Sequence, residues 1–265
     1  LADDTAVALA DRAERCAVLS GRLLRAAGLY EHAEGAVEQL GAGALDQWHE
    51  VSLEAGETRR QCMIVGGDAP ELHRIRMAVG KGARAELFVV ITGNDYCRVE
   101  VETDLAEGAH FELGGVTIGG GDAVREIVTR TTHDAPEATS NQVVRAVHWD
   151  EATGNFLGAI NVGRLGQRTD AAQDFKALVL EKGASANAKP ELEIFADDVK
   201  CAHGAAIGQM DEMARYYMAS RGLAPDVAKR LLIRAFIADA LAALEDEEEA
   251  ERLLEAALDV LAERA

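Results

Sequence analysis

Apolar and polar residues alternate with a period of two through much of the middle of the chain. The run ARAELFV (83–89) is typical, and similar alternation surrounds it in VSLEAGETRRQ (51–61) and TDLAEGAHFEL (103–113). Period-two alternation indicates β-strands that bury one face and expose the other. The middle of the chain is therefore predicted to be mainly β.

Glycines punctuate this alternation at a regular interval. Gly56, Gly82 and Gly108 are 26 residues apart, each between two alternating segments, and LVLEKGASANA (178–188) repeats the arrangement. A fixed period in the twenties, with strands and glycine corners, is typical of a solenoid. A β-sandwich with coincidental glycine spacing is the alternative.

A parallel β-helix is the solenoid that fits this pattern. A single coil cannot bury its inner face alone, whereas stacked coils share a core and extend one another's ladders by about 4.8 Å per coil. Residues 45–205 would supply about six coils at this period.

The two ends of the chain have a different pattern. Residues 1–44 begin with an Ala- and Leu-rich stretch that could be helical or irregular, and we expect a cap segment there. From residue 208 the pattern is helical. Asp211 is a candidate N-cap for a helix over 212–221, and Pro225 suits the first turn of another over 225–244.

A last helix is predicted over 247–264, where apolar residues form one stripe. The expected organisation is a cap at 1–44, a β-helix core at 45–207 and a helical subdomain at 208–265. We expect this subdomain to close the solenoid, because an end coil otherwise exposes strand edges.

Charge and apolar run length exclude several classes of protein. The chain has 46 acidic and 27 basic side chains, a net charge of −19, which argues against binding to nucleic acid or anionic lipid. No apolar run reaches the roughly 20 residues of a membrane helix. The first residues are acidic where a secretory signal would be basic, so a cytoplasmic location is expected. Cysteines 16, 62, 97 and 201 are widely spaced, which favours reduced thiols.

Catalytic motifs are missing from the sequence. There is no G-x-x-x-x-G-K-[ST] loop, so we expect no ATP site of its own, and neither G-x-S-x-G nor H-E-x-x-H occurs. The run GGVTIGGG (114–121) lacks dinucleotide-binding spacing, and solenoid corners explain it better. The sequence therefore predicts a protein that is not an enzyme.

One enzymatic alternative stays open because parallel β-helices often cleave polysaccharides. Asp197 and Asp198, with His203-Gly204 nearby, faintly resemble elements of polygalacturonases. Such an enzyme needs two carboxylates across a cleft and usually aromatic platforms for sugar rings. Only 5% of the residues are aromatic, so a carbohydrate-active enzyme is the second hypothesis.

Other polar residues are given structural roles. The run GQRTDAAQDFK (166–176) is expected to bond across neighbouring coils through its polar side chains. The remaining histidines have no metal-ligand spacing, and each is expected to be a satisfied surface or edge residue. These histidines are 32, 49, 73, 110, 133 and 148.

The stretch PELEIFADDVKCAHG (190–204) carries the main candidate chemistry. Its alternation changes phase at Asp197-Asp198, which indicates a solenoid corner or bulge. If 199–203 is extended, Cys201 and His203 project from one face. A thiolate and an imidazole suit Zn, Fe or Cu(I) and iron–sulfur chemistry, although two ligands cannot close a site. Spacing alone favours packing, with a buried Cys201 and a capped His203. A nucleophile pair is also geometrically possible, but nothing supplies an orienting third group.

Several of these segments together resemble one family. KPELEIFADDVKCAHGAAIGQMDE (189–212), YYMASRGL (216–223) and LLIRAFIADAL (231–241) are similar to the C-terminal signature of the SufB/SufD family, the scaffold subunits of the SUF iron–sulfur cluster assembly system. GNFLGAINVGRLGQRTDAAQDFKALVL (154–180) also resembles a family stretch. The sequences of the KPELEI and DDVKCAHGA runs are closer to SufD than to SufB.

The resemblance implies a fold, partners and a site. SufD-like proteins have a right-handed parallel β-helix with C-terminal helices, pair with SufB through the β-helix and bind the ABC-type ATPase SufC through those helices, here 208–245. A transient iron–sulfur cluster is expected at the subunit interface, with His203 and Cys201 as its metal ligands from this chain. The complex has been associated with reduced flavin, for which no residue can be assigned.

The same resemblance leaves two points open. The region before residue 45 is shorter than the N-terminal region usual in SufD, so the partner could be a SufB-like subunit or a second copy of this chain. A third hypothesis is a purely structural stabiliser of SufB, in which neither His203 nor Cys201 is a ligand.

Overall fold

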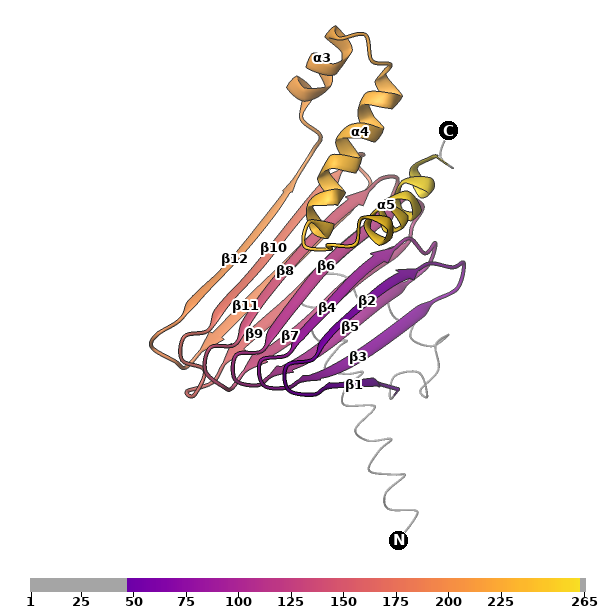
Figure 1. The fold of residues 1–265 in the computed structure, drawn as a ribbon. Helices are drawn as coiled ribbons and strands as arrows, with labels where there is room; N and C mark the ends of the chain where they lie inside the picture. Colours follow the sequence, from indigo (N-terminus) through magenta and orange to yellow (C-terminus); the bar gives the residue numbers. More distant parts are fainter. Residues whose placement is uncertain (1–46, 263–265) are drawn as a thin grey trace.

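The computed structural model describes residues 47–262 of the 265-residue chain (Figure 1). The expected cap at 1–44, together with Cys16 and His32, lies outside the described residues.

The described chain forms a solenoid of six coils, each contributing one strand to each of two parallel sheets. We call the sheet with the order β1-β3-β5-β7-β9-β11 sheet A, and the sheet with the order β12-β10-β8-β6-β4-β2 sheet B. The predicted β-helix is confirmed, and the β-sandwich alternative is wrong, because neighbouring strands pair in parallel. The strands are β1 His49–Leu53, β2 Thr58–Val65, β3 Glu71–Val79, β4 Arg84–Ile91, β5 Cys97–Leu105, β6 His110–Gly119, β7 Val124–His133, β8 Thr139–His148, β9 Thr153–Val162, β10 Asp170–Val179, β11 Ser185–Ile194 and β12 Lys200–Gly208.

Three periodic glycines form the corners between sheets A and B in the first coils. Gly56, Gly82 and Gly108 have φ values of 73°, 63° and 65°, a left-handed conformation that a side chain disfavours. The corners also stack on one another, because the Gly56 N–H donates to the Lys81 carbonyl and the Gly82 N–H to the Glu107 carbonyl, both at 2.9 Å. Glycine is therefore favoured at this point of each early coil, and Glu137 adopts the same conformation, with φ 61°, at the next corner.

The length of a coil changes along the solenoid. His49 pairs with Ile75, 26 residues later, as the glycine spacing predicts. In the last coils Thr153 is instead in register with Ser185, 32 residues later. Later coils have longer corners, which is why the 26-residue period fades after Gly108.

The core lies between the two sheets. Inward-facing side chains of successive coils stack in columns, and most of these columns are aliphatic. Phe156 and Phe175 face each other from sheets A and B, with ring centroids 5.7 Å apart. Such stacking supplies the shared core that a single coil lacks.

Helices follow the last strand. They are α3 Glu212–Ser220, α4 Pro225–Ala238, the 3₁₀ turn η2 Asp239–Leu241 and α5 Glu247–Ala262. The Asp211 carboxylate accepts from the N–H groups of Met213 and Ala214, so the predicted N-cap is confirmed. Pro225 begins α4 as expected, but α4 ends at Ala238 instead of continuing to 244.

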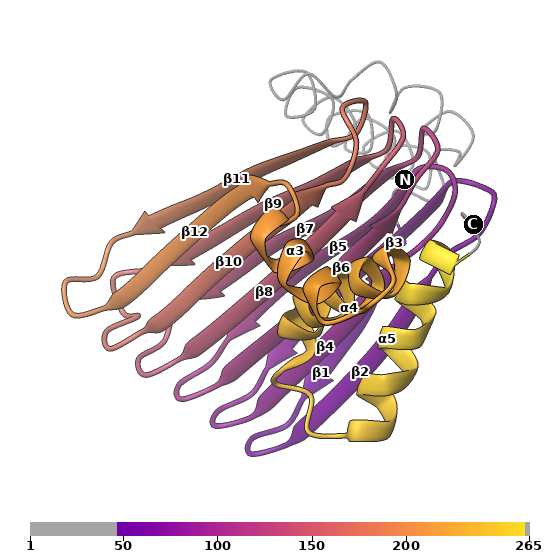
Figure 2. The ribbon, with the colours of Figure 1, turned by 90° about the horizontal axis from the view of Figure 1, so that it is seen from above.

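α4, η2 and α5 lie on a face of the solenoid and not across its end (Figures 1 and 2). Ile233, Ile237 and Leu253 pack on Phe88 and Val116 of the outer face of sheet B. The expectation that the helical part closes the solenoid is therefore wrong. The outward side chains of β4, β6 and β8 are apolar there, which draws the helices onto the sheet.

The glycine-rich run 114–121 corrects a second expectation. Gly114 and Gly115 lie inside strand β6, and only the end of the run forms a corner. A Cβ on Gly114 would stand 2.1 Å from the Ala240 carbonyl oxygen, and one on Gly115 would meet Ile127 at 2.6 Å. These glycines allow close packing on both faces of sheet B.

No helix within residues 47–262 combines the length and the apolar character needed to cross a membrane.

Candidate functional site at the open end of the solenoid

Among residues 47–262, the last coil leaves two strand edges without a neighbouring strand. β11 ends sheet A and β12 ends sheet B, and both are far more exposed than the strands before them. Large apolar side chains are exposed around them: Ile194 at 39%, Phe195 at 59% and Ile207 at 51%. Unpaired edges flanked by apolar residues are a ready surface for strand pairing with another chain.

Backbone directions show which groups are free at these edges. The N–H groups of Ser185 and Phe195 donate to residues of the preceding coil, so odd-numbered residues of β11 point toward β9. Pro190 is even-numbered, and its missing N–H therefore lies at the free edge and costs the ladder nothing. In β12 the N–H of Lys200 points toward β10, so the odd-numbered residues face the free edge.

Cys201 and His203 lie on one face of β12, as the sequence predicts. Cys201 is in register with Ala171 and His203 with Gln173, both inward-facing residues of β10. The two side chains therefore continue inner columns of the solenoid at its open end. The corner predicted at Asp197-Asp198 is confirmed, since β11 ends before it and β12 begins after it.

The environments of Cys201 and His203 differ. Cys201 is half-buried and packs near Ile160 and Val162, whereas His203 is exposed. Burial, with a smaller contribution from the Asp170 carboxylate, raises the pKa of the Cys201 thiol above its ordinary value. The thiol form is therefore favoured until a cation approaches.

The two residues do not form a complete metal site by themselves. Among the residues that the structure describes, no group of three or more His, Cys, Asp or Glu side chains is arranged to hold a metal ion. Any ion at Cys201 and His203 would need further ligands from outside the described residues.

An arginine connects the helical part to the late coils. Arg145 of β8 is buried, and its guanidinium bonds both Asp239 of η2 and Asp174 of β10. Asp174 is in register with Gly204, the residue after His203. Burial opposes ionisation of Asp174, but the bonds from Arg145 and Lys176 outweigh it and hold the pKa of this carboxyl below its usual value.

The polar run 166–176 behaves only partly as predicted. The Gln167 side chain accepts from the Asp198 N–H across neighbouring coils at 3.1 Å. Gln173 is instead buried inside the solenoid, and neither its amide nitrogen nor its amide oxygen has a hydrogen-bond partner. Sequence reasoning missed Gln173, although a glutamine at an inward position of an alternating strand is a signal that could have singled it out.

Several histidines have hydrogen-bond partners as predicted, but two are not at the surface or edge positions that the sequence predicts. His110, on the outer face of sheet B, bonds Thr139 at 2.7 Å and Glu112 at 3.1 Å. His133 and His148 are fully buried, so the expectation of surface or edge positions is wrong for them. Both occupy inward-facing positions, His133 of β7 in register with Val162 and His148 of β8 in register with Gly119.

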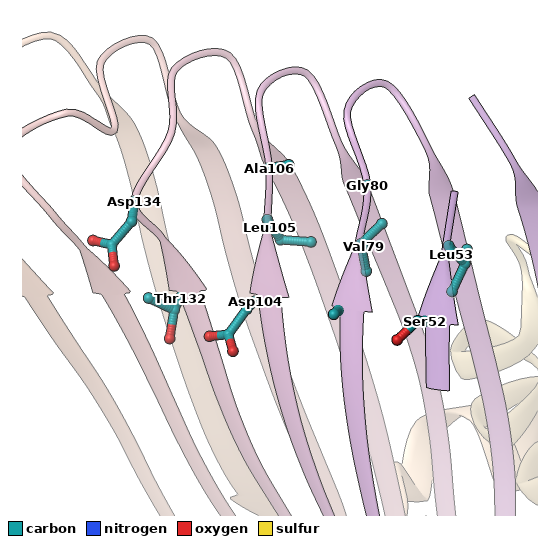
Figure 3. A pocket seen from close by; sticks show the side chains of 10 residues that line it. Ser52, Leu53, Val79, Gly80, Asp104, Leu105, Ala106, Thr132 and Asp134 are labelled. Carbon is teal, nitrogen blue, oxygen red and sulfur yellow. The ribbon is translucent and has the colours of Figure 1, made fainter. Parts of the chain in front are cut away.

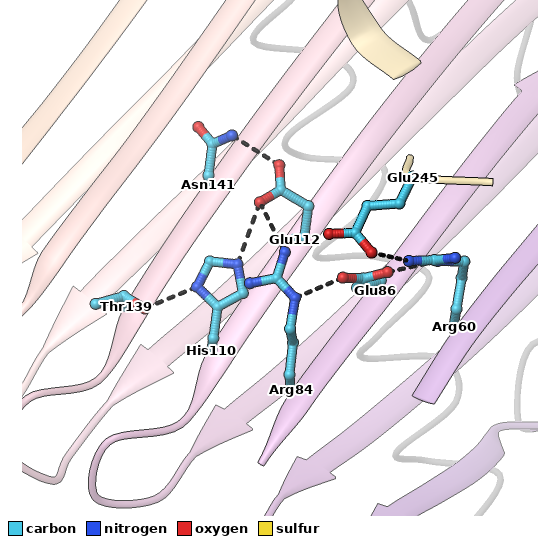
Figure 4. A network of polar contacts seen from close by, with 8 residues as sticks. All are labelled: Arg60, Arg84, Glu86, His110, Glu112, Thr139, Asn141 and Glu245. Carbon is cyan, nitrogen blue, oxygen red and sulfur yellow. Dashed lines mark hydrogen bonds and ion pairs between the residues drawn. The ribbon is translucent and has the colours of Figure 1, made fainter. Parts of the chain in front are cut away.

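The polar network around His110 lies on the outer face of sheet B (Figure 4). Arg60 and Arg84 both bond Glu86, at 2.6 and 2.5 Å. Burial of Glu86 is outweighed by these bonds, and the pKa of its carboxyl lies below the usual value. Ion pairs between coils explain the network, and it includes neither Cys201 nor His203.

A shallow groove of about 530 Å³ lies at the ends of the sheet A strands in the early coils (Figure 3). Its polar side chains are Ser52, Asp104, Thr132 and Asp134, and none of its lining residues is aromatic. It does not contain Cys201, His203 or the Asp197-Asp198 corner. The groove therefore offers no sugar platform to the carbohydrate-active alternative.

The comparisons with known proteins identify the family. A family model described as the SufBD core domain of SUF system FeS cluster assembly matches residues 37–236. The chain belongs to the SufB/SufD family. This SufBD core includes all twelve strands as well as α3 and most of α4.

Individual relatives agree with this membership. An iron–sulfur cluster assembly SufBD family protein of Synechocystis is 34% identical over 66% of this chain and 39% of its own length. The iron–sulfur cluster assembly protein SufD of Escherichia coli is 31% identical over 64% of this chain and 41% of its own length. SufD of Bacillus subtilis is 26% identical over 66% of this chain and 40% of its own. The chain thus matches about two fifths of the length of each of these relatives.

Proposed function

We propose that the chain is a SufD-like scaffold subunit that helps to assemble iron–sulfur clusters in the cytoplasm and is not itself an enzyme. The observation that supports this most is the open last coil. It presents Cys201 and His203 in inward-facing columns, directly beside two unpaired strand edges. A site with two ligands at an open edge is suited to a metal site whose remaining ligands come from a second subunit.

The partner at this edge is a SufB-like subunit, or a second copy of this chain. Its strands would add to β11 and β12, so that main-chain hydrogen bonds continue both sheets across the interface. Phe195 and Ile207, exposed beside the edges, would be buried by the same contact. Pro190 restricts the register, because at its position on the edge the carbonyl can accept a hydrogen bond but no N–H can donate one.

The cluster is the cargo of this interface. The His203 imidazole and the Cys201 thiolate suit iron, and the partner would supply the remaining ligands. Iron would displace the proton of the Cys201 thiol, whose pKa is raised by burial, so that binding at this residue releases a proton. The chain contributes ligand positions and shape, and no bond of a substrate is broken by its own side chains.

The helices are the docking site for a SufC-like ABC ATPase, within residues 208–245. α3 has no buried residue, and Met213, Tyr216 and Tyr217 are 72%, 72% and 59% exposed on it. Aromatic and methionine side chains in such a group are typical of protein interfaces. Movement of the ATPase would reach the late coils through α4, η2 and the Arg145 bridge.

Reconstitution of the cluster tests the ligand role. The chain and its SufB-like partner are purified together, and iron and sulfide are added anaerobically to the wild type and to His203→Ala and Cys201→Ala variants. We expect each variant to lose most of the iron-dependent absorbance, while Ala206→Ser, which faces outward on the same strand, keeps it. Normal cluster yield in both variants would leave only the role of a structural stabiliser of SufB.

Retention of the ATPase tests the docking site. We expect Tyr216→Glu, on the exposed face of α3, to lower the amount of SufC-like ATPase that co-purifies with the chain. Asp259→Ala on α5 serves as the control, because it is exposed on a helix that lies on the sheet. Equal retention in the two variants would refute docking through α3.

A further inference from the structure

Gln173 is buried and polar and has no hydrogen-bond partner among the described residues. Its side chain is 2% exposed, and neither atom of its amide makes a hydrogen bond. Gln142, one coil earlier in the same column, donates to Thr131 at 3.0 Å and accepts from Thr129 at 2.6 Å. A buried amide that gives up its hydrogen bonds with water lowers stability, so Gln173 requires an explanation.

The position of the Gln173 amide is fixed by its neighbours. Across the interior, a Cβ on Gly158 would stand 2.6 Å from the Gln173 amide nitrogen, so the amide fills the space that glycine leaves free. On the side of the preceding coil, both amide atoms of Gln142 are already bonded to threonines. The following coil is the other neighbour of Gln173 along this column, and its residue there lies at the open end of the solenoid.

The residue of the following coil in this column is His203. Gln142, Gln173 and His203 are in direct register on β8, β10 and β12, and adjacent parallel strands lie about 4.8 Å apart. His203 is exposed at the open end, so its ring is free to turn about its side-chain torsions. At the spacing of neighbouring strands, such a turn would let one ring nitrogen approach the amide oxygen.

We propose that Gln173 is a positioning residue for His203. The Gln173 amide oxygen accepts the N–H of one imidazole nitrogen, which fixes the tautomer and leaves the lone pair of the other nitrogen directed out of the open end. Metal-binding histidines commonly have their second nitrogen held in this way by an acceptor. The inference rests on the proposed function, because it gives His203 its orientation toward the cargo iron.

The tautomer of His203 tests this directly and without iron. Long-range ¹H–¹⁵N spectra of the full chain with labelled histidine, at a pH where the imidazole is neutral, report which ring nitrogen carries the proton. We expect Gln173→Met, which keeps the length but removes the acceptor, to change the His203 tautomer ratio about fivefold. Gln173→Glu keeps an acceptor oxygen in place and should preserve the wild-type tautomer.

The control is Gln61→Met. Gln61 is half-buried at the opposite end of the same inner column, in register with Leu87. A general loosening of the solenoid would alter the His203 signals in this variant as well, whereas a specific hydrogen bond from Gln173 leaves them unchanged. An unchanged tautomer ratio in Gln173→Met, or the same change in Gln61→Met, would overturn the proposal.

Cluster reconstitution with the SufB-like partner separates this inference from the proposed function. If the Gln173→Met spectra are unchanged but His203→Ala abolishes the cluster, the positioning role is wrong and the scaffold function stands. If Gln173→Met changes the tautomer but His203→Ala assembles a normal cluster, Gln173 orients His203 and the ligand role is wrong.

Discussion

At Gly114, the missing side chain decides how closely the helices approach sheet B. The carbonyl of Ala240 occupies the space in which a Cβ would lie, at 2.1 Å from the ideal Cβ position. Ala240 belongs to η2, the short turn that follows α4. The packing of the helical part on the solenoid therefore depends on this one residue of β6.

We expect Gly114→Ala to push η2 away from the sheet and to lower the free energy of unfolding by about 1–3 kcal/mol, because the backbone has to shift. Urea unfolding monitored by circular dichroism measures this change. The control is Gly208→Ala, since no heavy atom lies within 4 Å of a Cβ there. Equal stability of the two variants would show that η2 accommodates the methyl group.

Single residues also show which features of the site can be predicted from the sequence and which cannot. Alternation with a phase change at Asp197 was enough to predict that Cys201 and His203 share a face, because period two applies within one strand. Gln173 was missed for a different reason. Its lack of a partner depends on Gly158 and Gln142, which come from other coils, and register between coils of unequal length cannot be read from one sequence.

At the scale of elements, Arg145 joins three parts of the chain. Its guanidinium lies between Asp239 of η2 and Asp174 of β10, and its own strand is β8. Arg145 is fully buried, while the two carboxylates are 38% and 55% exposed. Buried charges of this kind are costly when they are unpaired, so the bridge ties the helical part to the fifth coil.

A double-mutant cycle on Arg145→Met and Asp239→Asn measures the coupling between these two residues. We expect a coupling of about 1 kcal/mol in the free energy of unfolding, reduced from a fully buried pair by the solvent around Asp239. Additive effects of the two substitutions would mean that the ion pair does not connect η2 to the solenoid.

The placement of the helices could not be predicted from their own sequences. The Asp211 cap and the Pro225 start are local signals, and both are confirmed. The face on which the helices pack is set by Phe88 and Val116, outward residues of distant strands. An apolar residue in an alternating strand does not by itself show which neighbour covers it.

At the scale of the whole molecule, buried histidines make the solenoid sensitive to acid. Burial, with a smaller effect of the Arg125 charge, lowers the pKa of His148 from its ordinary value of 6.5 to about 3, and burial lowers the pKa of His133 to about 4. Both are therefore neutral in the fold at neutral pH. The unfolded chain binds protons at these residues more readily, so their contribution to stability is present above pH 6.5 and is lost as the pH falls.

We expect the free energy of unfolding to fall below pH 6.5 by about 1.4 kcal/mol per pH unit for each of these histidines, down to roughly pH 4. Urea titrations between pH 7.5 and 4.5 measure the slope. His148→Asn should reduce the slope by about one proton, whatever it does to stability at pH 7.5. A slope unchanged by this substitution would contradict the assignment.

The solenoid itself could be predicted because its early coils repeat. Gly56, Gly82 and Gly108 recur at one interval, since the same corner conformation is needed each time. The later coils lengthen by several residues, and the repeat is then lost from the sequence although the architecture continues. The repeat made the fold predictable. Because the repeat is lost in the later coils, the register between Gln173 and His203 could not be predicted.

Burial along the solenoid also sets an order in which the coils should open. The strands from β5 to β8 are largely buried, whereas no residue of β11 or β12 is buried. In a stacked array, each coil is held by its neighbours, and an end coil has only one. Amide hydrogen exchange should therefore be faster in β11 and β12 than in the central strands β5 to β8. A docked partner would supply the missing neighbour, so occupancy of the site would be visible as slowed exchange in the last coil.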